Sequence, residues 1–319
     1  MNYTSSRIVL VVLLLAGSYR AAMAEDILIG QTADLSSVTS TQTKDFNDGV
    51  KLALKLVNAR GGIGGRHIKL LTMDDAYGEL AATKNAETLV ANPNIVALFG
   101  TRGSNPTEAV IKVAERERIA LIAPVNGADA VRASKFVFPV RASYKSEVDS
   151  VLAYFAIVPT RVAVLVQDDK FGQPLFAYIT EELKKTQYKN IRLAGAVVFG
   201  RKADELTNST AQILAMKPRA VIALCNPTAC SKFLQSLLKQ TSTTKDQRPA
   251  VAQLSNADML AQFTELGAEG LVGNPFAQVM PDPRRSGLTI ARDFVADVKR
   301  DGQGIDINYR SFEGYISAL

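Results

Sequence analysis

The sequence predicts an α/β protein with two lobes, each built around a doubly wound parallel sheet. From residue 26 onward, short apolar runs typical of strands alternate with helical patterns. Apolar runs between helices are typical of parallel strands that helices cover on both faces. The alternation comes in two sets on either side of a connecting stretch at 139–145, and 319 residues suffice for two such lobes.

The first set begins with a strand pattern at 27–30 and a helix pattern at 44–59. In that helix Phe46, Val50, Ala53, Leu54 and Val57 fall on one face at helical spacing. The set continues with strand patterns at 67–73, 95–99 and 119–122 and helix patterns at 79–91 and 105–116.

The second set opens with a helix pattern at 146–157 and an uninterrupted apolar strand pattern at 161–166. It continues with helix patterns at 173–186, 204–216 and 229–240 and strand patterns at 193–199, 219–224 and 249–253. Two such sets predict two doubly wound lobes.

The glycines at 61–65 could be taken for a dinucleotide-binding loop. Such a loop follows a strand and precedes a helix, so that a pyrophosphate meets the helix N-terminus. Here the order is reversed, because the glycines follow the helix pattern and precede the strand pattern. We therefore interpret Gly61 and Gly62 as residues that end the helix in the left-handed conformation.

Residues 1–24 are predicted to be a signal peptide. Arg7 precedes an apolar run at 8–16, and Ala22-Met23-Ala24 supplies the small residues that a signal peptidase reads. The run is too short to span a bilayer, and no other stretch is long enough. We therefore expect a periplasmic protein without stable membrane insertion.

The composition is that of a globular protein, with 47% apolar and 21% charged residues. The net charge is +6, and it falls to +4 without the two arginines of segment 1–24. The basic residues are spread along the chain and form no block with interleaved aromatics. A nucleic-acid partner is therefore not expected.

Cys225 and Cys230 are the only cysteines, and export would permit a disulfide. Spacing alone leaves both a local bridge and two unpaired thiols open. Two cysteines and a single histidine, His67, make a poor ligand set for a structural zinc. We expect no metal and no cofactor.

The residues also argue against an enzyme. We interpret His67 as structural, because a lone histidine in a strand pattern lacks an acid–base or nucleophilic partner set. The doublets Asp74-Asp75 and Asp168-Asp169 are poor acid/base pairs, since adjacent strand-end residues point to opposite sides. We expect them to cap loops.

In open parallel sheets, ligands bind beyond the carboxyl ends of the strands. The loops to inspect are 31–43, 74–78, 100–105, 124–129, 167–172, 225–228 and 253–257. The segment 100–106, which includes Ser104 and Asn105, can aim a hydroxyl and helix N–H groups at a carboxylate, and 124–128 can do the same. Each loop taken alone is better interpreted as an ordinary N-cap turn, but the convergence of the set on one crevice favours a ligand site.

A family resemblance is carried by motifs spread in order along the chain, at 27–31, 57–66, 74–77, 97–100, 122–124, 138–141 and 167–172. The chain resembles the periplasmic ligand-binding proteins of the Leu/Ile/Val-binding type, which serve ABC importers. The resemblance implies the type I periplasmic binding protein fold, with two lobes joined by hinge strands that close on a small ligand. The chain is also similar to a large subgroup with the Asp-Asp-x-Tyr form, which ends here at Tyr77 near the expected cleft.

The resemblance also implies site residues. Ser104 matches the hydroxyl residue that holds the ligand carboxylate in such proteins, and Val125, Asn126 and Gly127 match the segment that completes that site. Phe171 matches an aromatic residue that closes over the ligand from the second lobe. Asn226 stands where another aromatic residue would be expected.

Ser255 lies near the position where amino-acid binders place an acid for the α-ammonium group. No Asp or Glu matches that position, although Asp258 is close, so a carboxylated or neutral polar ligand fits as well as an amino acid. Arg102 would favour an anionic ligand if it faced the cleft, but a loop arginine is more often exposed. The cysteine pair of some branched-chain binders cannot form, because Tyr77 and Gly103 occupy its positions.

The expected organisation is a first lobe at 25–141, completed by 274–319, and a second lobe at 142–273. The chain stops in a helical pattern at 315–319, and the usual further helix and strands of the family are expected to be missing. The expected function is capture of a small polar or carboxylated, amino-acid-like metabolite by a monomer that delivers it to an ABC importer permease. A soluble sensor that presents its ligand to a receptor is the alternative.

Overall fold

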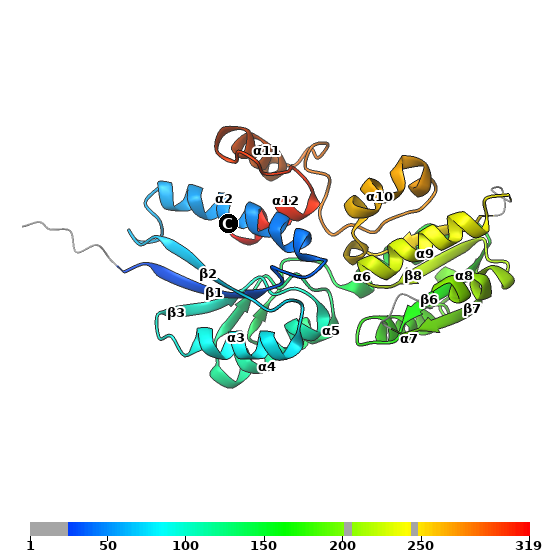
Figure 1. The fold of residues 1–319 in the computed structure, drawn as a ribbon, viewed down its shortest axis with the longest axis horizontal. Helices are drawn as coiled ribbons and strands as arrows, with labels where there is room; N and C mark the ends of the chain where they lie inside the picture. Colours follow the sequence, from blue (N-terminus) through cyan, green and yellow to red (C-terminus); the bar gives the residue numbers. More distant parts are fainter. Residues whose placement is uncertain (1–24, 201–205, 244–247) are drawn as a thin grey trace, which may run out of the picture.

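The computed structural model describes residues 25–200, 206–243 and 248–319, which form two lobes with one parallel sheet each (Figure 1). The predicted α/β fold with two doubly wound parallel sheets is confirmed. The proposed signal peptide lies outside the described residues. Within them, no helix combines the length and apolarity needed to cross a membrane.

The first sheet has the strand order β2-β1-β3-β4-β5. Its strands are β1 (Ile27–Ala33), β2 (Ile68–Asp74), β3 (Ile95–Phe99), β4 (Ala120–Ile122) and β5 (Val137–Phe138). Helix α2 (Ser40–Ala59) covers one face, and α3 (Glu79–Val90) and α4 (Ser104–Glu117) cover the other (Figure 1). A short α5 (Asp129–Ala133) precedes β5. The order reverses between β1 and β3, which places a crevice at the carboxyl ends of these strands.

The second sheet has the order β7-β6-β8-β9. Its strands are β6 (Thr160–Gln167), β7 (Ile191–Phe199), β8 (Ala220–Leu224) and β9 (Ala250–Gln253). They are covered by α6 (Tyr144–Phe155), α7 (Gly172–Glu182), α8 (Leu206–Ala215) and α9 (Pro227–Gln240), followed by α10 (Met259–Leu271). Buried Val, Ile and Leu side chains of β6 and β8 point into both helix layers, as expected for a parallel sheet covered on both faces.

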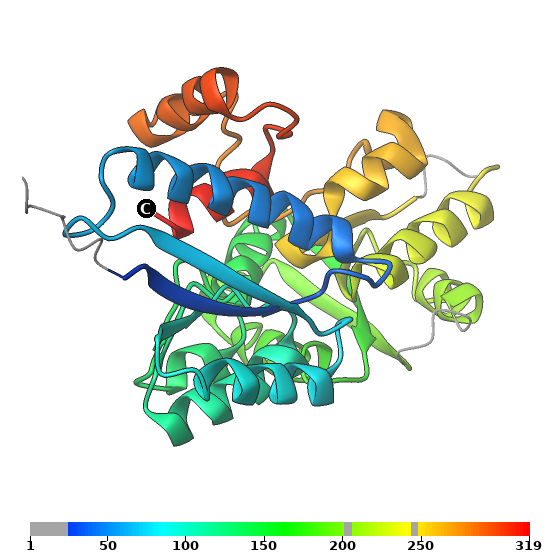
Figure 2. The same cartoon turned by 60° about the vertical axis from the view of Figure 1, so that its left-hand side comes forward.

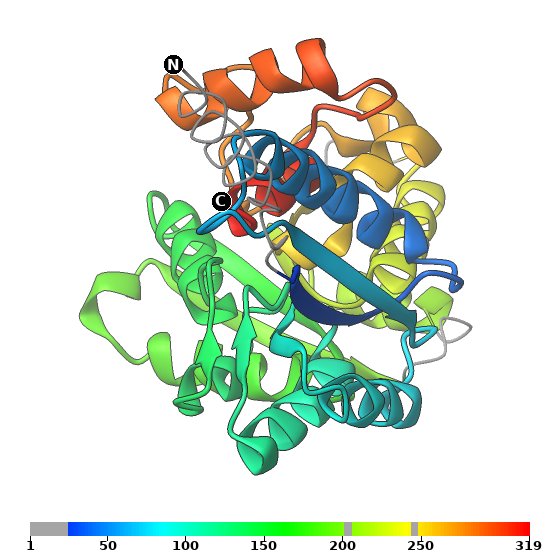
Figure 3. The same cartoon turned by 90° about the vertical axis from the view of Figure 1, so that its left-hand side faces the viewer.

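The chain crosses between the lobes at 139–143 and again after Phe276, which pairs with Gln253 as an isolated bridge. After the second crossing come α11 (Thr289–Asp301) and α12 (Tyr309–Ser317), which return to the first lobe. Figures 2 and 3 show α12 beside α2, with α11 on the outside of this pair.

Helices α2 and α12 approach so closely that two glycines are required. A Cβ added to Gly49 would lie 1.8 Å from the carbonyl oxygen of Ser311, and one added to Gly314 would lie 1.9 Å from that of Phe46. Neither distance leaves room for a side chain, so the contact depends on backbone packing. The close contact fixes the beginning of α12 against the crevice.

The turn between α2 and β2 confirms the helix-ending role of its glycines. Gly61 and Gly62 have φ values of +98° and +70°, which favour glycine. The N–H of Gly62 donates to the carbonyl of Val57 at 3.0 Å and closes the last helical turn. The side-chain amide of Asn58 then bonds both the N–H and the carbonyl of Ile68, at 2.8 and 2.9 Å, and pins the start of β2.

The two cysteines form a disulfide that joins the end of β8 to the first turn of α9, and both are fully buried. Of the two alternatives that spacing left open, the bridge is therefore the one observed. The predicted helix at 204–216 begins in residues outside the described part. The other predicted elements are present, with shifts of a few residues at their ends.

Candidate functional site

A cleft lies between the two lobes, next to the points where the strand order of each sheet reverses. Its empty volume is about 790 Å³, part of it open to solvent. Both lobes and the first crossing contribute to its lining, which consists of Gln42, Phe46, Tyr77, Arg102, Gly103, Ser104, Asn105, Val125, Arg141, Tyr144, Gln167, Asp169, Phe171, Asn226, Pro227, Ser255, Asn256, Arg310 and Glu313.

The first lobe presents the beginning of α4 to the cleft. Gly103, with φ +84°, turns the chain after β3, and a Cβ there would lie 2.6 Å from the ring of Tyr77. No side chain caps α4, and within the described chain the side chains of Ser104 and Asn105 make no hydrogen bond. A hydroxyl, an amide and open helix N–H groups can together hold a carboxylate or another polar group.

Arg102 lies beside this helix start, and its side chain is only 10% exposed. The guanidinium stacks over the ring of Tyr77 at 5.3 Å, and NH1 lies 3.8 Å from Oδ2 of Asp34. NH1 donates to Oγ1 of Thr39 at 3.3 Å, and NH2 donates to Oε1 of Gln42. The expectation of an exposed loop arginine is wrong, because the loop after β1 and the start of α2 converge on Arg102 and supply its acceptors.

A second guanidinium, that of Arg141 in the first crossing, meets Glu313 of α12, and both side chains are 6% exposed. Nε of Arg141 lies 2.9 Å from Oε1 of Glu313 without the alignment of a hydrogen bond, while NH2 donates to Oε2 at 3.3 Å. Burial disfavours the charge, but Glu313, Tyr144 and Glu147 together outweigh it and raise the pKa of Arg141. The pair ties α12 to the crossing.

The second lobe contributes a chain of hydrogen bonds at the ends of β6 and β8. Asn226 caps α9 by accepting from the N–H of Ala229 at 2.9 Å, and its own N–H and Nδ2 donate to Oε1 of Gln167, each at 2.8 Å. Nε2 of Gln167 donates to Asp169 at 2.5 Å, and Oδ1 of Asp169 accepts from the N–H of Phe171 at 2.9 Å. These side chains therefore orient one another.

Two aromatic rings meet where the lobes come together. Phe171 packs edge-on against Tyr144 with ring centroids 5.0 Å apart, and both side chains are mostly buried. Burial raises the pKa of Tyr144 to about 12, so its hydroxyl stays protonated at neutral pH. The rings give the cleft an apolar side.

Ser255 is held by an acid that the sequence analysis did not find. Its N–H and Oγ donate to the two carboxylate oxygens of Glu147 in α6, at 2.7 and 2.9 Å. Glu147 is buried, and burial raises its pKa. The two residues are 108 positions apart, so no local motif could have indicated the pair. Asp258 instead faces Arg310 and Gln42.

Asn126 and Gly127 do not line the cleft. The side chain of Asn126 is fully buried, donates to the carbonyl of Gly103 at 3.2 Å and accepts from the N–H of Ala128 at 2.8 Å. Gly127 lines a neighbouring depression, and its carbonyl accepts from the N–H of Tyr144 at 2.8 Å. The Asn126 side chain and the Gly127 carbonyl therefore brace the α4 loop and the contact between the lobes.

Among the residues selected from the sequence, the cleft brings together Tyr77, Ser104, Asn105, Val125, Phe171, Asn226 and Ser255. Their contact with a ligand stays a prediction. Gln42, Arg141, Arg310 and Glu313 also line the cleft but were not among the residues selected from the sequence. Arg141 ends a motif that carries the family resemblance, which was the only local signal for it.

Asp74, Asp75 and Asp169 cap loops as expected, whereas Asp168 accepts from the side chain of Gln173. Oδ1 of Asp74 accepts from the N–H groups of Leu35 and Ala76, and Oδ1 of Asp75 accepts from that of Tyr77. His67 is exposed just before β2. Among the described residues, no group of three or more His, Cys, Asp or Glu side chains is arranged to hold a metal ion.

Two parallel-sheet lobes with a polar cleft between them define the type I periplasmic binding protein fold. The chain belongs to the periplasmic binding protein family, whose sequence model matches residues 26–319. The chain is 25% identical over 185 residues to the Leu/Ile/Val-binding protein of Escherichia coli strain K12, a match that covers 57% of this chain and 50% of that protein. The leucine-specific-binding protein of Salmonella typhimurium is 26% identical over 188 residues, with the same coverage. The chain thus spans about half the length of the curated relatives it matches.

Solved structures agree on the fold. A substrate-binding periplasmic protein from Ralstonia solanacearum superimposes with a TM-score of 0.81 at 25% identity, covering 92% of this chain and 82% of that one. A fatty acid ABC transporter substrate-binding protein from Thermomonospora curvata has a TM-score of 0.80 at 15% identity, covering 92% of this chain and 74% of that one. The second similarity shows the fold alone.

Proposed function

We propose that this chain is a periplasmic solute-binding protein that captures a small polar or carboxylated, amino-acid-like metabolite and delivers it to an ABC importer permease. The family supports this proposal, as do the relatives named as Leu/Ile/Val-binding and leucine-specific-binding proteins. The protein acts as a monomer that binds without chemical turnover.

One observation carries the proposal, namely the unpaired polar groups at the start of α4. Ser104 and Asn105 face the cleft with no hydrogen-bond partner in the described chain, next to open helix N–H groups. A carboxylate placed there would receive charge-assisted hydrogen bonds and the favourable end of the helix dipole. Tyr144 and Phe171 offer apolar contact to the rest of a small ligand.

The ligand site draws on both lobes, so binding and closure are coupled. A ligand that touches both walls favours the closed arrangement by its extra contacts in that state. We place the ligand between the α4 start and Tyr77 on one side and Phe171, Asn226 and Ser255 on the other, with Val125 beside them. Glu147 holds Ser255 from behind and adds a carboxyl group near this wall. A ligand that carries an ammonium group is therefore compatible with the second lobe.

A thermal-shift screen of amino acids, amides and small carboxylates on the purified protein tests the proposal. A ligand at about 100 times its Kd adds roughly 2.7 kcal/mol to the free energy of unfolding, which raises Tm by several degrees. Circular dichroism confirms that the protein is folded. A folded protein that no compound stabilises would count against solute binding, and turnover of a stabilising compound would indicate an enzyme.

A further inference from the structure

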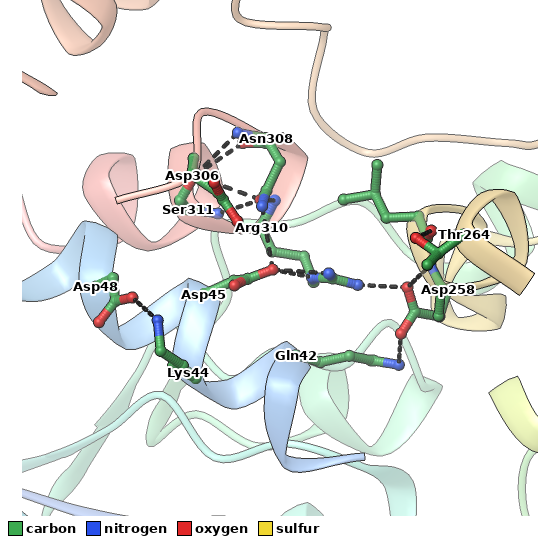
Figure 4. A network of polar contacts seen from close by, with 12 residues as sticks. Gln42, Lys44, Asp45, Asp48, Asp258, Thr264, Asp306, Asn308, Arg310 and Ser311 are labelled. Atoms are coloured by element: carbon green, nitrogen blue, oxygen red, sulfur yellow. Dashed lines mark hydrogen bonds and ion pairs between the residues drawn. The ribbon is translucent and has the colours of Figure 1, made fainter. Parts of the chain in front are cut away.

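A network of polar contacts joins the two lobes at one side of the cleft (Figure 4). At its centre lies Asp258, at the start of α10, with both carboxylate oxygens bonded to groups of the first lobe. Oδ2 accepts from Nε2 of Gln42 in α2 at 2.7 Å, and Oδ1 accepts from NH1 of Arg310 in α12. We propose that Asp258 is a latch that holds the lobes closed and that it positions Arg102 at the cleft through Gln42.

The latch residue is itself held in a defined position. Asp258 has φ +58° and ψ +65°, a left-handed conformation that is uncommon outside glycine, although aspartate and asparagine adopt it more readily than most residues. Its Oδ1 also caps α10 by accepting from the N–H of Ala261 at 3.0 Å, and the residue is 9% exposed. A costly backbone conformation persists where the surrounding contacts over-determine it, and such positions concentrate at ligand clamps and switch regions.

The first lobe presents its half of the latch already assembled. Nε and NH2 of Arg310 donate to Oδ2 of Asp45 at 3.0 and 2.7 Å, and Asn308 donates to the same oxygen at 3.1 Å (Figure 4). Burial disfavours the charge of Arg310, but Asp258 and Asp45 outweigh it and raise its pKa. Opening the lobes would leave Asp45 on Arg310 and remove Asp258.

Gln42 connects the latch to the ligand wall. Because its Nε2 donates to Asp258, its Oε1 is turned toward Arg102, whose NH2 donates to it. Arg102 lines the cleft beside Ser104 and stacks over Tyr77. When the lobes open and Asp258 moves away from Gln42, the Gln42 amide is free to rotate. Arg102 then loses a fixed hydrogen-bond acceptor. This positioning step rests on the proposed function, whereas the latch itself needs no ligand.

A second ion pair crosses between the lobes and provides a matched control. Nζ of Lys170 lies 2.9 Å from Oε2 of Glu108, with the lysine side chain 46% and the glutamate side chain 23% exposed. Exposed pairs contribute little, because water screens them and long side chains lose freedom. The Asp258 carboxylate is 8% exposed and accepts from two partners across the interface.

The latch is tested on the ligand-free protein by single-molecule fluorescence transfer between dyes on the two lobes. Exposed Thr88 and Lys239 are replaced by cysteine for labelling, since both native cysteines are buried in a disulfide. The variant Asp258→Asn keeps a residue that caps helices and tolerates the left-handed region. It should lower the closed-to-open ratio by about tenfold or more, as expected for loss of charge-assisted hydrogen bonds.

The control Glu108→Gln should change that ratio by about threefold or less. Thermal unfolding of each variant establishes that it is folded. A folded Asp258→Asn variant with the closed-to-open ratio of the unsubstituted protein would overturn the latch, and so would a ligand-free protein that is open in all molecules.

A second arm uses a ligand identified by the thermal-shift screen. Asp258→Asn should weaken its affinity by about tenfold or more, while Glu108→Gln leaves the affinity within about threefold. If a ligand binds equally well to both variants, the link to Arg102 is wrong while the proposed function stands. If no ligand is found, the fluorescence measurement still decides the latch.

Discussion

The two walls of the cleft use similar polar residues in opposite ways. On the first lobe, Ser104 and Asn105 make no side-chain hydrogen bond within the described chain. On the second lobe, Gln167, Asn226 and Ser255 are bonded to protein partners. The difference teaches that the first wall offers unpaired polar groups, while the second presents polar groups that protein partners have already oriented. Under the proposed function, the first wall would recognise a ligand and the second would enclose it.

The buried charged groups Arg141 and Glu313 should stabilise the fold, unlike the unpaired hydroxyl of Ser104 and amide of Asn105. The change Glu313→Gln leaves the buried guanidinium of Arg141 without its carboxylate and should cost about 3 kcal/mol in the free energy of unfolding. Urea denaturation measures it. Glu117→Gln, which removes an exposed partner of Arg116, should leave the free energy of unfolding nearly unchanged, because water screens exposed pairs. Equal losses of stability in Glu313→Gln and Glu117→Gln would show that the buried pair stabilises the fold no more than the exposed pair does.

A smaller loss is expected on the second wall. Asn226→Ala removes the cap of α9 and one donor to Gln167, which should cost about 1–2 kcal/mol and also loosen the wall. Ser143→Ala is the matched control, because Ser143 caps α6 by accepting from the N–H of Ser146 at 3.0 Å without belonging to the cleft lining. Both variants should lose stability in urea, but only Asn226→Ala should also lose ligand affinity. Unchanged affinity would mean that the second wall need not be pre-oriented.

The smallest effect on stability is expected at Ser104, where the two walls differ most. Because the hydroxyl has no protein partner, Ser104→Ala should leave the free energy of unfolding within about 0.5 kcal/mol. Affinity for a carboxylated ligand should fall about tenfold or more, since a hydrogen bond to a charged group is lost. Calorimetric titration measures the affinity, and Ser150→Ala on the exposed face of α6 is the control. A stability loss without an affinity loss would reverse the roles assigned to the walls.

The sequence predicted the alternation of strands and helices because each element carries its own apolar period. The first turn of α2, at Ser40–Thr43, was missed since it contains only polar residues, although Gln42 and Thr43 are buried. Helices α10, α11 and α12 were not assigned as separate elements. Their apolar faces have meaning only against α2 and the second sheet, which a local pattern does not reveal.

The residues of the candidate site also divide into those that a local sequence pattern could reveal and those that it could not. Ser104 and Phe171 could be found because they follow strand ends, where parallel sheets place ligands. Arg310 and Glu313 could not, because α12 reaches the cleft only through contacts between distant segments. Glu147, which holds Ser255 from behind, could not be found for the same reason. Asn126 was selected from its place after a strand, but the sequence did not reveal that its side-chain amide is buried and bonded to backbone groups of Gly103 and Ala128.

The close packing of α2 on α12 also predicts the order in which the two lobes fold. Asp45 and Arg310 are 265 positions apart, whereas the strands of the second sheet all come from residues 160–253. Contacts between distant segments form late because a long loop must close first. Pulse-labelling hydrogen exchange during refolding should therefore protect the amides of β6 and β8 before those of α12, and the reverse order would contradict this. A newly made molecule would acquire its second lobe first, and the cleft would be complete only when α12 docks and brings Arg310 and Glu313 to its lining.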